Sequence, residues 1–128
     1  MAFSTLLGLA IIMLVALVLV KQFFLTRQVR QCEARVVAEK IKSEKLLLLD
    51  VRTPAELRNG QIAGALNIPV QELGRRLAEL EKYREREIVV YCASGQRSLR
   101  AAHLLQKRGF NVVNMRGGMT AWRALPQA

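Results

Sequence analysis

The chain opens with an uninterrupted apolar stretch. Residues 2–20 contain no charged side chain, and nineteen residues at about 1.5 Å each form a helix roughly as long as the bilayer's hydrocarbon layer is thick. A signal peptide would have basic residues before the apolar run and a small-residue cleavage site after it. Here the first basic residue is Lys21, and Phe23 and Phe24 follow it. We therefore predict an uncleaved transmembrane anchor at residues 1–25.

A cluster of basic residues follows the anchor. It consists of Lys21, Arg27, Arg30 and Arg35, opposed only by Glu33. Basic residues beside a membrane span favour the cytoplasmic side. The expectation is therefore a single-pass protein of the plasma or inner membrane with a cytoplasmic domain. Residues 26–34 are predicted to be a juxtamembrane linker and residues 35–128 the domain.

Short apolar runs and amphipathic segments alternate through the domain. The predicted strands are residues 36–37, 46–49, 65–68, 88–91 and 110–115. The predicted helices are residues 38–44, 70–84 and 98–108, with a short last helix after Gly117 and Gly118 that packs Trp122 into the core. The run 46–49 is four leucines, typical of a strand buried on both faces of a parallel sheet. This alternation predicts an α/β domain with a small parallel sheet flanked by helices.

Composition limits the classes of partner. The 128 residues suffice for one domain with one core. The net charge of +10 could suit nucleic acid, but aromatic residues make up only 5% and no nucleic-acid motif is present. The excess charge lies beside the apolar run and after residue 92, whereas residues 50–91 carry seven basic and seven acidic residues. We therefore predict no nucleic-acid partner.

The strongest candidate for chemistry is Cys92, which follows strand 88–91 and precedes a loop of small residues and a helix. Backbone N–H groups in such a loop point inward, and the helix N-terminus adds positive potential. Both effects favour a thiolate, the nucleophilic form of cysteine. Gly95 permits the positive φ that such a loop requires. The alternative is a buried structural cysteine at the end of a core strand.

Charged residues near this loop break a local rule. Arg97 and Arg100 lie at the start of a helix, where the macrodipole disfavours cations. A broken local rule points to function, and we expect both arginines to attract an anionic substrate and to lower the pKa of Cys92. His103 falls on the polar side of the same helix, with Arg100 and Lys107, which argues against a Cys–His catalytic pair.

Three other residues are weaker candidates. Asp50 and Arg52 follow strand 46–49, at the end of a strand where ligand sites of open α/β sheets gather. Their alternative interpretation is a structural ion pair. Cys32 could be a resolving thiol, a lipidation site or an incidental residue. Two cysteines do not make a disulfide framework, and no ligand spacing predicts a metal site.

Several motifs together carry a family resemblance. They are residues 49–52 (LDVR), Glu56 followed by residues 60–69 (GQIAGALNIP), the loop 92–98 (CASGQRS) and residues 116–122 (RGGMTAW). In order and spacing they resemble the rhodanese family, sulfurtransferases that carry sulfur as a cysteine persulfide. Gln61 stands where the family usually has histidine. The resemblance spans residues 34–125 and implies the rhodanese-like α/β fold.

The resemblance also implies a mechanism and a site. Cys92 would be the nucleophile that becomes a persulfide. The substrate-binding residues would be Arg52 and the loop residues Ala93, Ser94, Gly95, Gln96, Arg97 and Ser98. The partners would be a small anionic sulfur donor such as thiosulfate, and a thiol or cyanide-like acceptor. No metal or organic cofactor would be required, and the N-terminal helix would hold the protein in the membrane.

Two other functions stay open at this point. Cysteine phosphatases and arsenate reductases carry an arginine at the sixth position after the cysteine, to grip the oxyanion. Here that position is Ser98, and Arg97 comes one residue early. The second alternative is a non-catalytic rhodanese-like module that binds a partner at the membrane. Such a module has no need of a thiol in a cup of N–H groups.

Overall fold

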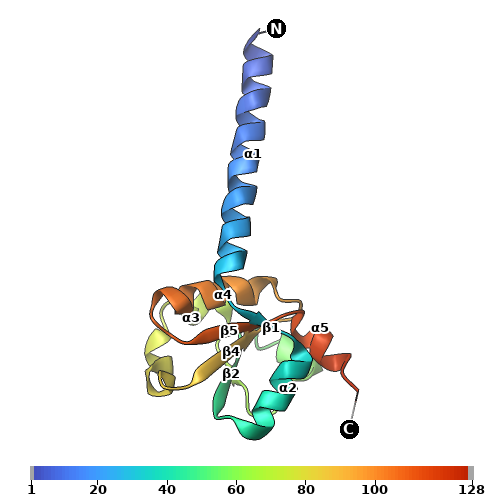
Figure 1. The fold of residues 1–128 in the computed structure, drawn as a ribbon, viewed down its shortest axis with the longest axis vertical. Coiled ribbons are helices and arrows are strands. Elements are labelled where there is room, and N and C mark those ends of the chain that lie inside the picture. The colour runs from blue at the N-terminus through green and yellow to red at the C-terminus, as the bar shows by residue number, and fades with distance from the viewer. Residues whose placement is uncertain (1, 127–128) are drawn as a thin grey trace.

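The computed structural model describes residues 2–126 of the chain, apart from the side chains of residues 25–28. Helix α1 (Ala2–Gln28) projects from the domain as a single rod (Figure 1). Its large apolar side chains from Phe3 to Phe24 are exposed, and the span Ala2–Phe24 is long and apolar enough to cross a membrane. The helix continues beyond residue 25 into the segment predicted as a linker.

The domain is built on one parallel sheet of five strands: β1 (Gln31–Cys32), β2 (Leu46–Asp50), β3 (Leu66–Asn67), β4 (Glu87–Tyr91) and β5 (Val112–Met115). Their order across the sheet is β1-β5-β4-β2-β3, and every pair is parallel. The predicted α/β architecture is confirmed. Strand β4 is the middle strand, so a residue at its carboxyl end lies at the centre of one sheet edge.

Helices cover both faces of the sheet (Figure 1). One face packs against α3 (Val70–Leu73), the 3-10 helix η2 (Leu77–Tyr83) and α4 (Gln96–Lys107). The other packs against α2 (Ala34–Ser43) and α5 (Gly118–Arg123), where Trp122 is half-buried rather than fully in the core. A further 3-10 helix, η1 (Glu56–Asn59), lies between β2 and β3. Alternate residues of β4 point to opposite faces, Val90 toward α4 and Tyr91 toward α2.

Two predictions about elements were wrong. The β-branched pair at residues 36–37 is helical, because Val37 lies in α2 and is fully buried against the sheet. The edge strand is β1 instead, within the segment predicted as a linker. The predicted helix 70–84 is interrupted, since α3 ends at Leu73, before Gly74, and η2 begins at Leu77.

The junction between α1 and the domain is short and is held by contacts with the domain. Only Val29 and Arg30 separate the helix from β1. Val29 is 4% exposed and belongs to the core on the α4 side of the sheet. The carbonyl of Arg30 accepts a hydrogen bond of 2.9 Å from the backbone N–H of Asn114. The C-terminal end of α1 also contacts α4. The apolar helix α1 is therefore joined directly to the folded core.

Candidate active site

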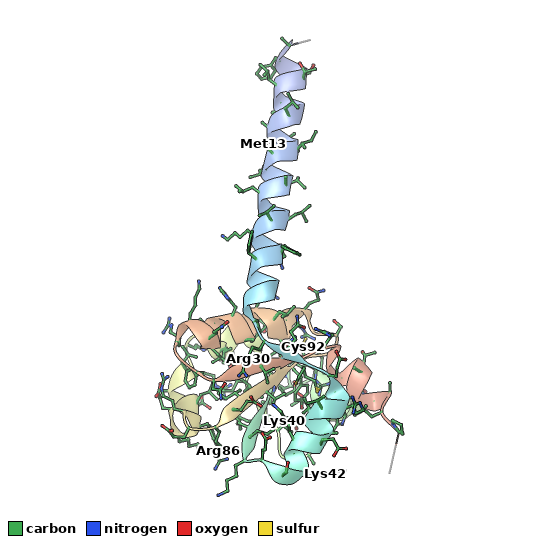
Figure 2. The ribbon with its side chains drawn as sticks, viewed as in Figure 1. Met13, Arg30, Lys40, Lys42, Arg86 and Cys92 are labelled. Carbon is green, nitrogen blue, oxygen red and sulfur yellow. The ribbon has the colours of Figure 1, made fainter. Side chains whose placement is uncertain are left out.

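Cys92 lies at the carboxyl end of the central strand β4, in the body of the domain (Figure 2). Such strand ends are where open α/β sheets place their ligand sites. The residue is 1% exposed, and helix α4 begins shortly after it, at Gln96. The loop between them turns tightly because Gly95 has a φ of 106°, in the left-handed region. The predicted strand–loop–helix unit is confirmed, with the helix starting slightly earlier than residue 98.

Hydrogen-bond donors converge on the sulfur. The backbone N–H of Gly95 donates to Sγ at 3.1 Å, and that of Ser98 donates at 3.4 Å. The Oγ of Ser98 lies 3.4 Å from the same sulfur. The N-terminus of α4 adds positive potential from the same side. We call the loop from Ala93 to Ser98, which carries these donors, the cup.

The cup favours the thiolate form of Cys92. Burial by itself raises the pKa of the thiol. Hydrogen bonds from the Ser98 side chain and from the backbone N–H groups of Ser98, Gly95 and Ser94 outweigh burial and hold the pKa below its ordinary value. The largest effects that lower this pKa are therefore hydrogen bonds of the loop, and the coulombic interaction between Cys92 and Arg97 acts in the same direction.

The N-terminus of α5 holds the loop from behind. The backbone N–H of Met119 donates to the carbonyl of Cys92 at 2.9 Å, and that of Thr120 donates to the carbonyl of Ala93 at 3.1 Å. The Thr120 hydroxyl reaches the Ala93 carbonyl as well, at 3.1 Å. In a trans peptide unit the C=O and the N–H point in opposite directions. Since these two carbonyls face α5, the N–H groups of Ala93 and Ser94 are free to face the sulfur. Sequence reasoning missed this role, and its only signal was the Gly117–Gly118 pair.

Gly118 allows this close approach. Its φ is 53°, and a Cβ there would overlap the carbonyl oxygen of Cys92 and lie 2.8 Å from the carbonyl carbon of Ala93. No side chain can occupy that position while α5 donates to both carbonyls. The glycine is therefore required by contact with the site as well as by its backbone angle.

Arg97 lies at the rim of the cup and is paired with Glu56. Two short hydrogen bonds of 2.6 and 2.8 Å join its guanidinium to the carboxylate. The bonds from Arg97 are the main reason why the pKa of Glu56 is lowered to about 2, against a smaller opposing effect of burial. Much of the charge of Arg97 is thus compensated by Glu56. Its predicted attraction of an anionic substrate stays a prediction.

Arg52 follows strand β2, the neighbour of β4, and forms a buried ion pair with Asp50. Its Nη2 is 2.8 Å from the Asp50 carboxylate, and its side chain is 3% exposed. The same nitrogen donates to the carbonyl of Gly60 at 2.8 Å. This arrangement supports the structural ion pair, one of the two interpretations that the sequence allowed. Contact between Arg52 and a substrate stays a prediction.

The other candidates surround the cup or lie apart from it. Ser94 and Gln96 are exposed on the loop, and Ala93 is half-buried. Cys32 is half-buried on β1, where burial raises the pKa of its thiol. Within residues 2–126, no group of three or more histidine, cysteine, aspartate or glutamate side chains could hold a metal ion. The arrangement thus provides one thiol with a lowered pKa inside a loop of inward-facing N–H groups.

Replacing Ser98 with alanine should raise the pKa of Cys92. The variant loses the hydroxyl beside Sγ but keeps the backbone N–H. Alkylation of Cys92 by iodoacetamide, followed by peptide mass spectrometry against pH, should show a midpoint displaced toward higher pH. Near neutral pH, a thiol that is a tenfold weaker acid has about one tenth of the thiolate. The matched control is Ser94→Ala, which keeps its own N–H. Equal displacements in both variants would contradict a specific role of the Ser98 hydroxyl.

Comparison with known proteins agrees with this geometry. Residues 33–125 match the family model of the rhodanese-like domain. A sulfurtransferase of Allochromatium vinosum is 43% identical over 81 residues, which cover 62% of this chain and 74% of that protein. The thiosulfate sulfurtransferase PspE of Escherichia coli is 32% identical over 71 residues, covering 56% of this chain and 68% of that protein.

A solved structure supports the same assignment. The rhodanese-related protein of Thermoplasma volcanium matches with a TM-score of 0.69 and 38% identity, covering 76% of this chain and 95% of that one. The relatives named as sulfurtransferases support sulfur transfer as the general chemistry. The matched segment contains the whole sheet apart from β1, together with the cup. The chain therefore belongs to the rhodanese-like domain family.

Proposed function

We propose that the protein is a membrane-anchored sulfurtransferase that moves sulfur from thiosulfate, or a similar donor, to a thiophilic acceptor through a persulfide on Cys92. The observation that carries the proposal is the convergence of the Gly95 and Ser98 donors on Sγ. A relative named as a thiosulfate sulfurtransferase supports the choice of donor. The acceptor would be a cellular thiol or a cyanide-like nucleophile.

The reaction needs two displacements at sulfur. The Cys92 thiolate attacks the outer sulfur of thiosulfate, a new S–S bond forms, and sulfite leaves with the electron pair of the broken bond. The acceptor then attacks the outer sulfur of the persulfide, and Cys92 leaves as a thiolate. The net charge of the reacting atoms is conserved in each step, and no oxidant is consumed. By this scheme no metal or organic cofactor takes part.

The cup would serve both steps. Donors preorganised around Sγ stabilise the thiolate before attack and the anionic persulfide after it. The positive end of α4 acts in the same direction. Because the donors belong to the backbone, their positions depend on the shape of the loop and not on side-chain rotamers.

The loop fits sulfur better than phosphate or arsenate. At the sixth position, where a phosphatase would place its arginine, Ser98 points its Oγ and N–H at the sulfur. The guanidinium of Arg97, one residue before, is bound to Glu56 at the rim. A phosphate would therefore lack the bidentate partner it needs. The thiol within the cup likewise argues against a purely non-catalytic module.

We also propose that α1 anchors the protein in the plasma or inner membrane, with the domain in the cytoplasm. The support is the length and composition of the span Ala2–Phe24 together with the basic residues that follow it.

The test of the proposed function is to find the sulfur on the protein. After incubation of the full chain with thiosulfate, intact mass spectrometry should show one added sulfur, and peptide mapping should place it on Cys92. Added cyanide should remove the sulfur and release thiocyanate. The variant Cys32→Ser should behave like the native chain. Sulfur on Cys32, or hydrolysis of p-nitrophenyl phosphate without any sulfur uptake, would contradict the proposal.

A further inference from the structure

Helix α4 presents a basic face on the side opposite the sheet. The residues Gln96, Arg100, His103 and Lys107 recur every three or four positions and so lie along one side of the helix. On the opposite side Ala101, Ala102 and Leu105 are buried in the core. Helix α4 contains no acidic residue. Arg100 and Lys107 are exposed, and His103 is half-buried. We call this side the α4 face.

The α4 face lies on the side of the domain from which α1 emerges (Figure 1). The end of α1 contacts α4 directly. The apolar span ends at Phe24, and Val29 is already buried in the domain core on the α4 side. Five residues at about 1.5 Å each separate these two points by roughly 8 Å. The domain can therefore not move far from the end of the span.

This distance matches the thickness of the lipid headgroup layer. The polar layer on each side of the hydrocarbon core is about 5–8 Å thick. Phe23 and Phe24 are exposed on α1 and form the end of the apolar span next to the domain. With α1 in a bilayer, the α4 face comes within about one screening length of the headgroups. The positive charges on that face would then attract headgroups of negative charge and not those of neutral lipids.

We propose that the α4 face binds the headgroups of anionic phospholipids in the leaflet where α1 ends. This inference rests on the proposed membrane anchor. Arg100 and Lys107 supply the positive charge, and each basic residue near an anionic surface strengthens binding about fivefold. By this proposal Arg100 binds lipid headgroups, instead of attracting the anionic substrate as the sequence suggested. Contact along the whole helix holds the domain, and with it the cup at the N-terminus of α4, in one orientation at the bilayer surface.

The test uses two exposed lysines at opposite ends of the domain. Lys107 lies on the α4 face, whereas Lys42 lies on α2 at the end remote from α1 (Figure 2). The full chain is placed in nanodiscs of pure phosphatidylcholine or of phosphatidylcholine with phosphatidylglycerol. The protein in each kind of nanodisc is acetylated with an uncharged reagent, to less than one modification per chain. Mass spectrometry then gives the rate at each lysine.

Lys107 should react about fivefold more slowly in the anionic nanodiscs, and Lys42 at the same rate in both. About 0.5 M salt should remove most of the difference, because exposed charges are then screened. The variant Arg100→Gln should lose at least half of the protection of Lys107. The control Arg86→Gln removes an exposed charge at the end remote from α1 and should keep the protection (Figure 2).

Equal Lys107 rates in the two lipids would overturn the inference while leaving the anchor intact. Protection of Lys107 that Arg100→Gln leaves unchanged would overturn the inference as well. The slower acetylation would then be explained by the lower pH near an anionic surface, without binding of the α4 face to headgroups. Protection seen only in native membranes that contain other proteins would assign the α4 face to a protein partner instead. Failure of the native chain to enter nanodiscs would refute the anchor itself, and the inference with it.

Discussion

Replacing Cys92 with serine is expected to abolish sulfur transfer and to leave the fold intact. A serine hydroxyl keeps the size and the buried position of the thiol, and it can accept the same N–H groups of Gly95 and Ser98. It cannot become the anion that attacks sulfur near neutral pH. The rate of thiocyanate formation from thiosulfate and cyanide should fall by at least about a thousandfold, as for other lost nucleophiles.

The control for this experiment is the second cysteine. Cys32 is half-buried on the edge strand β1, and burial raises rather than lowers the pKa of its thiol. Cys32→Ser should keep most of the activity. Thermal unfolding of both variants checks that the domain remains folded. Residual transfer by Cys92→Ser above the rate without protein would show that another group carries the sulfur.

Much of the fold could be predicted because its signals are local. The leucine run at β2 and the β-branched run at β4 are continuous and apolar, as buried parallel strands are. The amphipathic pattern of α4 marks both its buried and its basic side. The cup follows from the same kind of signal, since small residues with Gly95 sit between a strand and a helix.

The rest depends on contacts between distant parts of the chain. The bond between Glu56 and Arg97 joins residues 41 positions apart, and nothing local to either residue indicates it. Strand β1 has two residues, too few for any periodic pattern, and exists because Cys32 pairs with Met115 of β5. The structural ion pair of Arg52 was one of two possibilities until its surroundings were known.

The cup is shaped by two helix N-termini that act in opposite directions. In the first turn of α4, the N–H of Ser98 donates to Sγ, whereas the N–H groups of Met119 and Thr120 in α5 hold the carbonyls of Cys92 and Ala93. Helix α5 thereby orients the peptide units that follow Cys92 and Ala93. The pKa of Cys92 thus depends on residues that never touch the sulfur.

Replacing Gly118 with alanine tests this arrangement. The left-handed backbone at φ 53° disfavours alanine by about 1–2 kcal/mol. The new Cβ would also overlap the Cys92 carbonyl and push α5 away. Loss of the two backbone hydrogen bonds that α5 donates to these carbonyls adds about 1 kcal/mol each. Urea denaturation should therefore show the unfolding free energy lowered by about 3–4 kcal/mol.

The same change should impair the site. Without the hydrogen bonds from α5, the carbonyls of Cys92 and Ala93 are free to rotate. The N–H groups of Ala93 and Ser94, which belong to the same peptide units, then no longer point toward the sulfur. The pKa of Cys92 should rise, and sulfur transfer should fall at least about tenfold, since one misplaced donor in an anion-binding site has an effect of this order or more. Alkylation against pH and the thiocyanate assay measure the two effects.

Gly64→Ala is the matched control. Gly64 also has a positive φ, of 84°, but nothing lies within 4 Å of the Cβ that alanine would add. That variant should show only the backbone strain and should leave the pKa of Cys92 unchanged. Equal losses of stability in both variants, or an unchanged Cys92 pKa in Gly118→Ala, would show that α5 does not shape the cup. A larger loss in Gly118→Ala with a raised pKa would identify the contact between α5 and the loop as the cause.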